Sequence, residues 1–418
     1  MKFGILSQWF DPEPGGGALP GALARELASR GHEVSVLTGF PNYPSGHLYP
    51  GYSIRAKLDS WQDGIHIRRV ALYPNHDTSA SRRILNYGSF ALSATTVGLP
   101  LFDGLDAIWV YSSPATIAAP MWATKYLLGV PHVLHVMDLW PDSIFLSGFG
   151  GNGLSQGLPR RALNKWCSAM YKTASSVAYV TPGLRAELIH RGVPESKLHY
   201  VPGWADEEAS IISEISPRSI WGVGEEELLI LYAGTIGTAQ GLDSLIEGLA
   251  ILRGEVKVIC LLAGSGTEVE ALERLTQKHA LDNVHFLGQI PRDQISGIIS
   301  AVDLQVVMLR DSPLSSITMP GKIQTILSTG KPFIAAVAGD AQMAAQRSGA
   351  AFLATPGNPA SIAAAIREAA NMSRSELIAK GLRGKQNYQN EYSLDNAVNT
   401  LESLLIEAAN KGKRKHRN

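Results

Sequence analysis

This chain of 418 residues has little cysteine, no long uninterrupted apolar run and no excess of charge of either sign. Its two cysteines, Cys167 and Cys260, stand far apart with no histidine or cysteine at metal-ligand spacing, so neither a disulfide framework nor a structural zinc site is predicted. A reducing compartment, the cytosol, is therefore expected. Lys plus Arg and Asp plus Glu each number 37, a balance that excludes a strongly basic nucleic-acid-binding protein.

Targeting and membrane-spanning segments are not predicted either. The N-terminal apolar run ends at Asp11 and Pro12, too early for a signal-peptide core, and no small-residue cleavage site follows it. The most apolar stretch, residues 84–102, is interrupted by Asn86 and Pro100. An interfacial or buried helix is expected there instead of a spanning one.

What the sequence does contain is a repeated alternation of short apolar runs with helical patterns. A strand at 2–10, a helix at 18–30 and a strand at 34–40 predict a parallel βαβ unit. The first half continues with strands expected at 106–111, 132–136, 176–181 and 199–202, and helices at 114–128, 159–173 and 182–190. The second half has strands expected at 228–233, 256–263, 284–287, 304–308, 332–337 and 351–353. This alternation predicts two doubly wound α/β domains.

The domain boundary is placed in a segment that has glycine, proline and an acidic run but little periodicity. The predicted parts are a first domain (1–205), a linker (206–226), a second domain (227–392), a C-terminal helix packing towards the first domain (393–410) and a basic tail (411–418). The first domain holds 17 Lys and Arg against 13 Asp and Glu, and every tryptophan lies at or before Trp221. Such a domain suits an anionic membrane surface, and a solvated face with core aromatics is the plainer alternative.

Candidate site residues in the first half follow strands at the edge where parallel strands end. Gly15, Gly16 and Gly17 form the first strand-to-helix turn, and a merely flexible turn is the alternative. They do not make a GxGxxG motif, and no acidic residue ends the second strand, so a nicotinamide cofactor is disfavoured. His135 and Asp138 at the end of the strand 132–136 can orient a sugar or polarise a hydroxyl, although a histidine alone is more often a core residue.

Glycine turns recur on the same edge of the predicted second sheet. A helix start with glycine and lysine suits a diphosphate, because the helix dipole and the ammonium group both favour an anion. The plainer alternative is a helix start with a solvated lysine. No metal-ligand triad is present by spacing, so no metal is predicted. The residues of these turns are Gly234, Gly237, Gly264, Gly266, Pro320, Gly321 and Lys322.

These residues resemble the family-4 glycosyltransferases of the GT-B fold over essentially the whole chain. Segment 27–34 (LASRGHEV) resembles the family's junction of first helix and second strand, and segments 189–194 (IHRGVP) and 201–206 (VPGWAD) resemble its approach to the second domain. Within the family, the chain resembles the branch of L-fucosamine (N-acetyl-fucosamine) transferases of surface-polysaccharide assembly. The segments that carry this resemblance are 138–141 (DLWP), 201–206, 233–237 (AGTIG), 239–242 (AQGL) and 322–325 (KIQT).

The resemblance implies two Rossmann-like domains facing a central cleft and retaining transfer from a UDP-linked sugar without a metal or other cofactor. It assigns the donor mainly to the second domain and the acceptor to the first. The catalytic residues that it implies are His135, Asp138 and Lys322. The donor-binding residues that it implies are Gly15, Gly16, Gly17, Gly234, Gly237, Gln240, Gly264, Gly266, Phe286, Leu287, Gly288, Pro320, Gly321 and Thr325.

The chain departs from the family pattern at two places. The family's paired glutamates fall at Ile317 and Thr325 here, so the usual carboxylate on the ribose is missing. The family's Arg and Lys after the strand 228–233 are replaced, with Thr235 and Gln240 in that region. Lys322 is then the best remaining cation for the leaving diphosphate.

The leading hypothesis is an enzyme at the inner face of the cell membrane that assembles lipopolysaccharide or capsule. It would add an N-acetylated deoxyhexosamine or hexosamine to a polyprenyl-diphosphate-linked saccharide, with peripheral binding to an anionic membrane and no nucleic-acid partner. A nucleotide-sugar 2-epimerase of the same fold is one alternative. A catalytically lapsed nucleotide-sugar-binding protein, suggested by Ile317 and Thr325, is the other.

Overall fold

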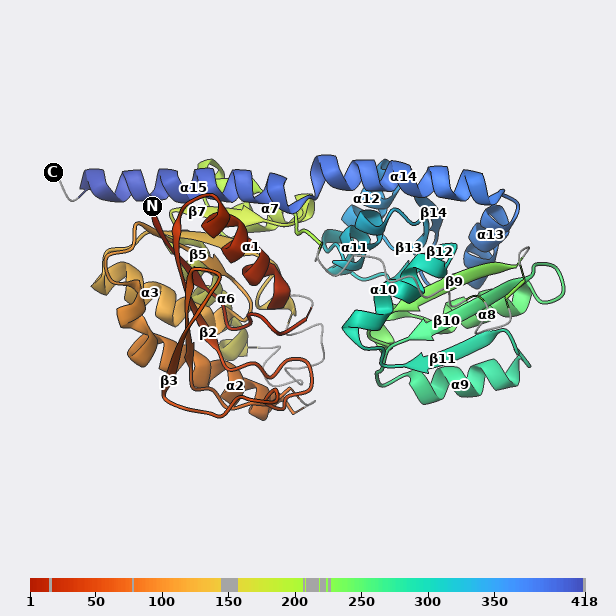
Figure 1. The fold of residues 1–418 in the computed structure, drawn as a ribbon, viewed down its shortest axis with the longest axis horizontal. Coiled ribbons are helices and arrows are strands. Elements are labelled where there is room, and N and C mark those ends of the chain that lie inside the picture. Colours follow the sequence, from red (N-terminus) through yellow and green to blue (C-terminus); the bar gives the residue numbers. More distant parts are fainter. Residues whose placement is uncertain are drawn as a thin grey trace. The chain divides into compact units, whose positions relative to one another are not determined.

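The structure, a computed structural model, describes residues 1–14, 17–76, 79–143, 157–205, 207, 218, 223–224 and 227–415. The chain divides into two compact units (Figure 1). The first unit contains Met1–Gly203 together with Leu394–Asn418, and the second contains Trp204–Ser393. Gly15, Gly16 and most of the predicted linker lie outside the described residues.

The first unit is built on an eight-stranded sheet with the order β3-β4-β2-β1-β5-β6-β7-β8. All neighbouring strands are parallel except the hairpin pair β3 and β4. The inner strands are apolar runs buried along nearly their whole length, as expected when helices cover both faces of a parallel sheet. The strands are β1 (Lys2–Leu6), β2 (Glu33–Gly39), β3 (Lys57–Gln62), β4 (Ile65–Val70), β5 (Ala107–Tyr111), β6 (His132–Val136), β7 (Ser176–Tyr179) and β8 (Leu198–Tyr200).

Two groups of helices cover this sheet. Helix α1 (Ala18–Ser29) packs against α15 (Leu394–Lys415), while α3 (Ala118–Leu127) contacts both α2 (Ala80–Ser93) and α6 (Gly157–Thr173). Helix α7 (Pro182–His190) begins with a proline, which the first turn of a helix tolerates, and packs on β7. None of the helices in the described ranges is long and apolar enough to span a bilayer.

The second unit contains a six-stranded, all-parallel sheet in the order β11-β10-β9-β12-β13-β14. Both units are thus doubly wound α/β structures, which confirms the predicted fold class. The strands are β9 (Leu228–Ala233), β10 (Val258–Ala263), β11 (Val284–Gly288), β12 (Leu304–Met308), β13 (Phe333–Ala336) and β14 (Ala351–Ala354). The helices are α8 (Asp243–Ile251), α9 (Val269–Lys278), α10 (Arg292–Ala301), α11 (Lys322–Thr329), α12 (Gly339–Ser348), α13 (Pro359–Ala370) and α14 (Arg374–Glu391).

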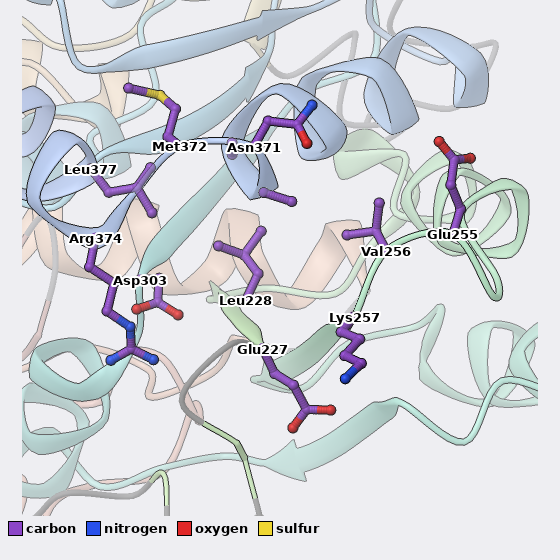
Figure 2. A pocket seen from close by; sticks show the side chains of 12 residues that line it. Glu227, Leu228, Glu255, Val256, Lys257, Asp303, Asn371, Met372, Arg374 and Leu377 are labelled. Atoms are coloured by element: carbon purple, nitrogen blue, oxygen red, sulfur yellow. The ribbon is translucent and has the colours of Figure 1, made fainter.

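A pocket lies at the amino ends of the strands in this second sheet. Leu228, Met372 and Leu377 are among the apolar residues that line it, and Figure 2 shows charged side chains around them. The carboxylate of Asp303 accepts hydrogen bonds from the Arg218 guanidinium and the Leu229 N–H group, both at 2.8 Å. Ligands of doubly wound sheets bind at the opposite, carboxyl edge, so this pocket is not where a donor is expected.

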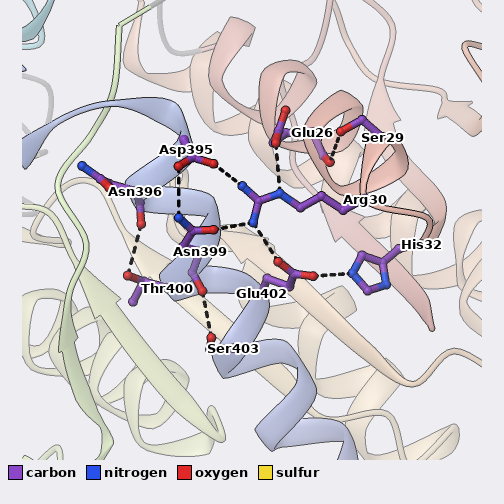
Figure 3. A network of polar contacts seen from close by, with 10 residues as sticks. All are labelled: Glu26, Ser29, Arg30, His32, Asp395, Asn396, Asn399, Thr400, Glu402 and Ser403. Carbon is purple, nitrogen blue, oxygen red and sulfur yellow. Dashed lines mark hydrogen bonds and ion pairs between the residues drawn. The ribbon is translucent and has the colours of Figure 1, made fainter. Parts of the chain in front are cut away.

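A polar network fastens α15 to the first unit (Figure 3). The Arg30 guanidinium, which follows α1, pairs with Glu402 at 2.8 Å and with Asp395 at 2.5 Å on α15. The His32 ring lies 2.7 Å from the other oxygen of Glu402. Along the buried face of the helix, Leu401 and Leu405 are fully buried. The last helix is therefore a structural part of the first unit.

In each sheet the strand order reverses at one place, between β1 and β5 in the first sheet and between β9 and β12 in the second. Loops leaving two such strands diverge to opposite faces of the sheet. This divergence leaves a crevice outside the carboxyl ends of the strands, where ligands of doubly wound folds bind. Each unit thus has one place where a site is expected.

Candidate functional site

In the second unit, glycines bring two loops together at the crevice beside β9. Gly234 and Gly264 have φ values of 140° and 148°, which other residues rarely adopt. A Cβ atom on Gly264 would stand 1.8 Å from the carbonyl oxygen of Gly234, and one on Gly266 would stand 2.2 Å from that of Ile236. Only glycine fits this close approach between the two loops.

Backbone hydrogen bonds hold these loops in place. The N–H group of Gly234 donates to Ala263, and that of Gly264 donates to Gly288 at 2.7 Å. Ile236 donates in the same way to Ser265. Four glycines singled out in the sequence, Gly234, Gly264, Gly266 and Gly288, therefore meet at one edge of the sheet, and close packing alone already requires three of them.

Lys322 is the cation of this crevice. Its Nζ atom lies 3.6 Å from the centre of the Tyr232 ring, and a Cβ atom on Gly234 would stand 2.7 Å from that nitrogen. The Tyr232 hydroxyl donates to the carbonyl oxygen of Thr235, which fixes the ring. Burial lowers the pKa of Lys322 to about 7. Among the described side chains no carboxylate pairs with this lysine, so the ammonium group is available to an anion beside the glycine loops.

The other predicted donor residues of this unit are placed differently. The side-chain oxygen of Gln240 accepts the N–H group of Gly237, and the Thr325 hydroxyl donates to the carbonyl oxygen of Gly321 at 3.2 Å. Gly321 faces open space. Phe286 and Leu287 are partly buried against two core clusters, and Pro320 precedes the helix start. The Gln240 side chain therefore stabilises the turn in which it lies.

Sequence reasoning missed Arg310, which follows β12. Its guanidinium donates to both oxygens of Asp243 at 2.8 Å and to the carbonyl oxygen of Thr238 at 2.8 Å. It therefore ties the loop after β9 to the loop after β12, the two strands that flank the crevice. A basic residue just past a predicted strand was the signal that could have identified it.

In the first unit, a pocket occupies the crevice between β1 and β5. Its lining residues come mainly from loops that follow the strands, and most of them are aromatic. Figure 1 labels β2 and β5, which carry two of these loops. The lining residues are Trp9, Gly17, Tyr43, His76, Arg83, Tyr87, Tyr111, Ser113 and Asp138.

The aromatic rings of this pocket meet at steep angles. The Trp9 ring lies 6.2 Å from Tyr111 and 6.4 Å from Tyr87, both edge to face. Tyr43 packs edge to face on His76 at 4.7 Å. Aromatic faces with a few polar groups between them are typical of pockets that bind small ligands, including sugars with their apolar C–H faces.

Two charged groups stand among these rings. Arg83 on α2 places a guanidinium nitrogen 3.3 Å from the His76 ring nitrogen, and burial together with this cation lowers the pKa of His76 to about 4. His76 is therefore neutral at pH 7, and its ring nitrogen can accept a hydrogen bond from the Arg83 guanidinium. Asp138 lines the pocket. Desolvation raises the pKa of its carboxyl, whereas a hydrogen bond with the Ser113 side chain lowers it.

His135 does not reach this pocket. Its ring is fully buried, its Nε2 atom is bonded to the carbonyl oxygen of Val201 at 2.9 Å, and it packs against Trp109. Burial lowers its pKa to about 4, so the ring is neutral. The His135 side chain thus lies in the core, and Asp138 is the residue of this segment that lines the pocket. The predicted contact between His135 and the transferred sugar stays a prediction.

Of the predicted first turn, Gly17 lines the pocket, while Gly15 and Gly16 lie outside the described residues. Sequence reasoning missed Trp9, Tyr43, Tyr87 and Arg83. Trp9 comes three residues after β1 and Tyr43 four after β2, so aromatic residues just past a strand were the available signal. Within the described ranges no cluster of three His, Cys, Asp or Glu side chains could hold a metal ion.

Comparison with known families finds two domains that correspond to the two units. Residues 15–204 match the glycosyl transferase 4-like domain, and residues 227–372 match the domain of glycosyl transferases group 1. The chain is 27% identical to the protein named as colanic acid biosynthesis glycosyl transferase WcaI of Escherichia coli, over 79% of this chain and 82% of the relative. It is 21% identical to the protein named as glycosyltransferase WbjE of Pseudomonas aeruginosa, over 72% and 76%.

Solved structures show the same architecture. Alr3699/HepE of Anabaena, solved in complex with UDP-glucose, superposes with a TM-score of 0.70 over 97% of this chain and all of the other, at 17% identity. Together with the two matched domains, this likeness confirms the predicted GT-B fold of two Rossmann-like units.

Proposed function

The chain is a glycosyltransferase that contains a glycosyl transferase 4-like domain and a glycosyl transferases group 1 domain. We propose that it transfers a sugar from a UDP-linked donor to a lipid-linked saccharide in surface-polysaccharide assembly. Two relatives support this proposal: WcaI is named for colanic acid biosynthesis, and Alr3699/HepE was solved with UDP-glucose. The observation that carries it is the Lys322 ammonium group beside the glycine loops at the crevice of the second unit.

The donor diphosphate belongs in that crevice. The bond between the anomeric carbon and the diphosphate oxygen breaks, and the electron pair leaves with UDP. The Lys322 ammonium group and nearby backbone N–H groups stabilise the charge that develops there, a contribution typically worth a few kcal/mol. The acceptor hydroxyl bonds to the anomeric carbon from the face that UDP leaves and passes its proton to the leaving diphosphate oxygen, so configuration is retained. None of these steps requires a metal ion.

The acceptor saccharide belongs in the aromatic pocket of the first unit. Its rings offer faces for the sugar, Asp138 offers a carboxyl to its hydroxyl groups, and Arg83 offers a cation for a lipid diphosphate. The resemblance to the fucosamine-transferase branch favours an N-acetylated deoxyhexosamine, such as N-acetyl-fucosamine, as the transferred sugar. Lipopolysaccharide or capsule assembly at the cytoplasmic face of the membrane follows from such an acceptor.

A membrane-facing surface is available on the same unit. Helix α3 contacts both α2 and α6, and apart from Arg83 of the pocket these helices carry six Lys and Arg and not one Asp or Glu in sequence. Leu92 is 67% exposed on α2, and Tyr126 and Leu127 are 70% and 71% exposed on α3. Exposed apolar side chains among cations suit the headgroup region of an anionic bilayer, where each cation contributes about 1 kcal/mol. The basic segment 411–418, whose described residues 411–415 form the end of α15, adds to this attraction.

Sedimentation with vesicles tests this surface. The double variant Leu92→Glu with Leu127→Glu is expected to lose binding to phosphatidylglycerol vesicles. The matched control changes Ile378 and Leu382 to Glu, two residues of α14 in the second unit that are 60% and 57% exposed. Equal binding by all three proteins, or binding that does not depend on anionic lipid, would rule out this surface.

The donor assignment is tested by thermal stabilisation with UDP, GDP, ADP, NAD, UDP-N-acetylglucosamine and UDP-N-acetyl-fucosamine. Selective stabilisation by the uridine compounds, lost in Lys322→Ala, is the expected result, because a ligand that binds only the folded state raises the melting temperature. No shift with any uridine compound would overturn the proposal. If incubation with the donor alone gave an epimerised nucleotide sugar, the protein would be an epimerase and the proposal of sugar transfer would be wrong.

A further inference from the structure

We infer that Glu13 is a positioning residue for the acceptor pocket: its carboxylate holds the loops that carry Trp9 and Tyr43, and its Cβ atom packs on Gly17. This inference rests on the proposed function and assigns a role that the site residues named above do not have. Glu13 lies in the loop between β1 and α1 and is 1% exposed, so it touches neither solvent nor a ligand.

The carboxylate accepts three backbone hydrogen bonds. Its Oε1 atom accepts the N–H groups of Asn42 at 2.7 Å and Tyr43 at 2.8 Å, and its Oε2 atom accepts that of Phe10 at 3.1 Å. Asn42 and Tyr43 belong to the loop after β2, whereas Phe10 belongs to the loop after β1. One side chain therefore joins the loops that leave two adjacent strands.

Each bonded segment carries a residue of the pocket. Tyr43 is itself a lining residue, and Phe10 directly follows the lining residue Trp9. The third lining residue, Gly17, packs on Glu13 so closely that an added Cβ atom would stand 2.8 Å from the Cβ atom of Glu13. A displacement of the Glu13 side chain is therefore expected to move Trp9, Gly17 and Tyr43 together.

Buried amides continue this support beneath the pocket. The Gln8 side chain donates to Asn86 at 2.6 Å, and Asn86 donates to Asn42 at 3.3 Å and to the carbonyl oxygen of Tyr73 at 2.7 Å. Asn86 lies on α2, the helix that places Arg83 in the pocket. This hydrogen-bond network therefore connects the loops that carry Trp9 and Tyr43 with α2, the helix that carries Arg83.

A carboxylate suits this position better than an amide. It offers acceptor lone pairs to all three N–H groups, whereas a glutamine would turn its own N–H₂ group towards at least one donor. Burial raises the pKa of Glu13 to about 7, and the three N–H groups and Arg69 act in the opposite direction. A charged or polar group with no exposed surface is costly unless it is satisfied, so removing the acceptor leaves loop N–H groups unpaired.

The experiment compares Glu13→Gln and Glu13→Ala in the full chain. The acceptor probe is undecaprenyl-diphosphate-N-acetylglucosamine and the donor is UDP-N-acetyl-fucosamine. We expect the KM for the lipid acceptor to rise roughly tenfold in the Gln variant and further in the Ala variant. The KM for the donor and the slow hydrolysis of the donor by water should stay within about twofold of wild type, since neither uses the pocket wall.

Asp303→Asn is the matched control. Asp303 is another shielded carboxylate that accepts a backbone N–H group, but it lies in the second unit at the amino edge of its sheet. It should lower the melting temperature without raising the acceptor KM. A Glu13→Ala enzyme with a wild-type acceptor KM, or a control that raises it equally, contradicts the positioning role.

Hydrogen exchange tests the geometry without any acceptor. The N–H groups of Phe10, Asn42 and Tyr43 should be protected in wild type and exchange at least about tenfold faster in Glu13→Ala, while β2 stays protected. Unchanged exchange at these groups overturns the inference even if transfer to the probe is absent. If exchange changes as expected but UDP compounds do not stabilise the protein, the proposed function is wrong. The role of Glu13 in holding the two loops together would still be supported.

Discussion

At the scale of single residues, Lys322 combines a cation with an aromatic support and a partly desolvated position. Its ammonium group lies over the Tyr232 ring, and burial lowers its pKa to about 7. The ring attracts the charged form while desolvation disfavours it. An anion that arrives beside Gly234 restores the missing counter-charge, so this lysine should take up a proton when the ligand binds.

Donor affinity is therefore expected to depend on pH. Below pH 7 Lys322 is already protonated, and above pH 7 binding must include proton uptake, so affinity for UDP-N-acetylglucosamine should fall by up to about tenfold per pH unit from 7 towards 9. Isothermal titration in buffers of different ionisation enthalpy measures both effects. Lys322→Ala should bind weakly at every pH and without proton uptake.

Lys257→Ala is the control for this titration, because Lys257 lines the amino-edge pocket of the same unit. Its pH dependence should equal that of wild type. If Lys322→Ala kept the wild-type slope, the titrating group would be another one.

A second residue-scale prediction separates two glycines that the sequence alone treats alike. Gly264→Ala sets a Cβ atom 1.8 Å from a backbone oxygen, so it should destabilise the second unit by roughly 3 kcal/mol or more. Gly288→Ala meets no atom within 4 Å and only has to adopt a φ of 66°, which costs about 1 kcal/mol. Melting temperatures of the two variants check this, and equal losses would contradict the close approach of the loops.

At the scale of elements, sequence patterns identified strands whose environment is uniform. Strands β6, β9 and β12 agree with their predicted bounds residue for residue, because each is a mainly apolar run that is buried along all or nearly all of its length. The hairpin of β3 and β4 was not predicted, since β3 is exposed along most of its length and has no apolar run. The pocket residues Trp9 and Tyr43 lie in loops without periodicity, and a strand pattern cannot show that His135 faces inward.

The contact between α1 and α15 gives an element-scale prediction. Arg30→Ala removes a guanidinium that is 19% exposed and pairs with Glu26, Asp395 and Glu402, so α15 should loosen by about 1 to 3 kcal/mol. Hydrogen exchange of α15 measures this. Lys2→Ala, which removes an ion pair with Glu33 that is 56% and 73% exposed, should change almost nothing, and an equal effect of both would discount the network.

At the scale of the whole molecule, the two units differ in how the chain builds them. The second unit is one continuous segment, whereas the first needs α15 from the end of the described chain. A chain shortened to residues 1–393 loses the fully buried Val398, Leu401 and Leu405, each worth roughly 1.5 to 3 kcal/mol. The first unit should unfold or aggregate.

The second unit of that shortened chain should still melt cooperatively and be stabilised by UDP, because the crevice proposed for the donor diphosphate is built from residues of this unit. Differential scanning calorimetry with and without UDP separates the two transitions. A first unit that melted at its wild-type temperature would show that α15 is dispensable.

The return of α15 to the first unit also sets an order of events during translation. When the ribosome has made residue 203, the sheet that is first in sequence still lacks a covering helix, and roughly 190 residues of another unit must be made before that helix follows. At synthesis rates of about 5 to 20 residues per second this interval lasts about 10 to 40 s. During this interval the second unit can be completed, while the surface of the first unit that packs against α15 stays uncovered.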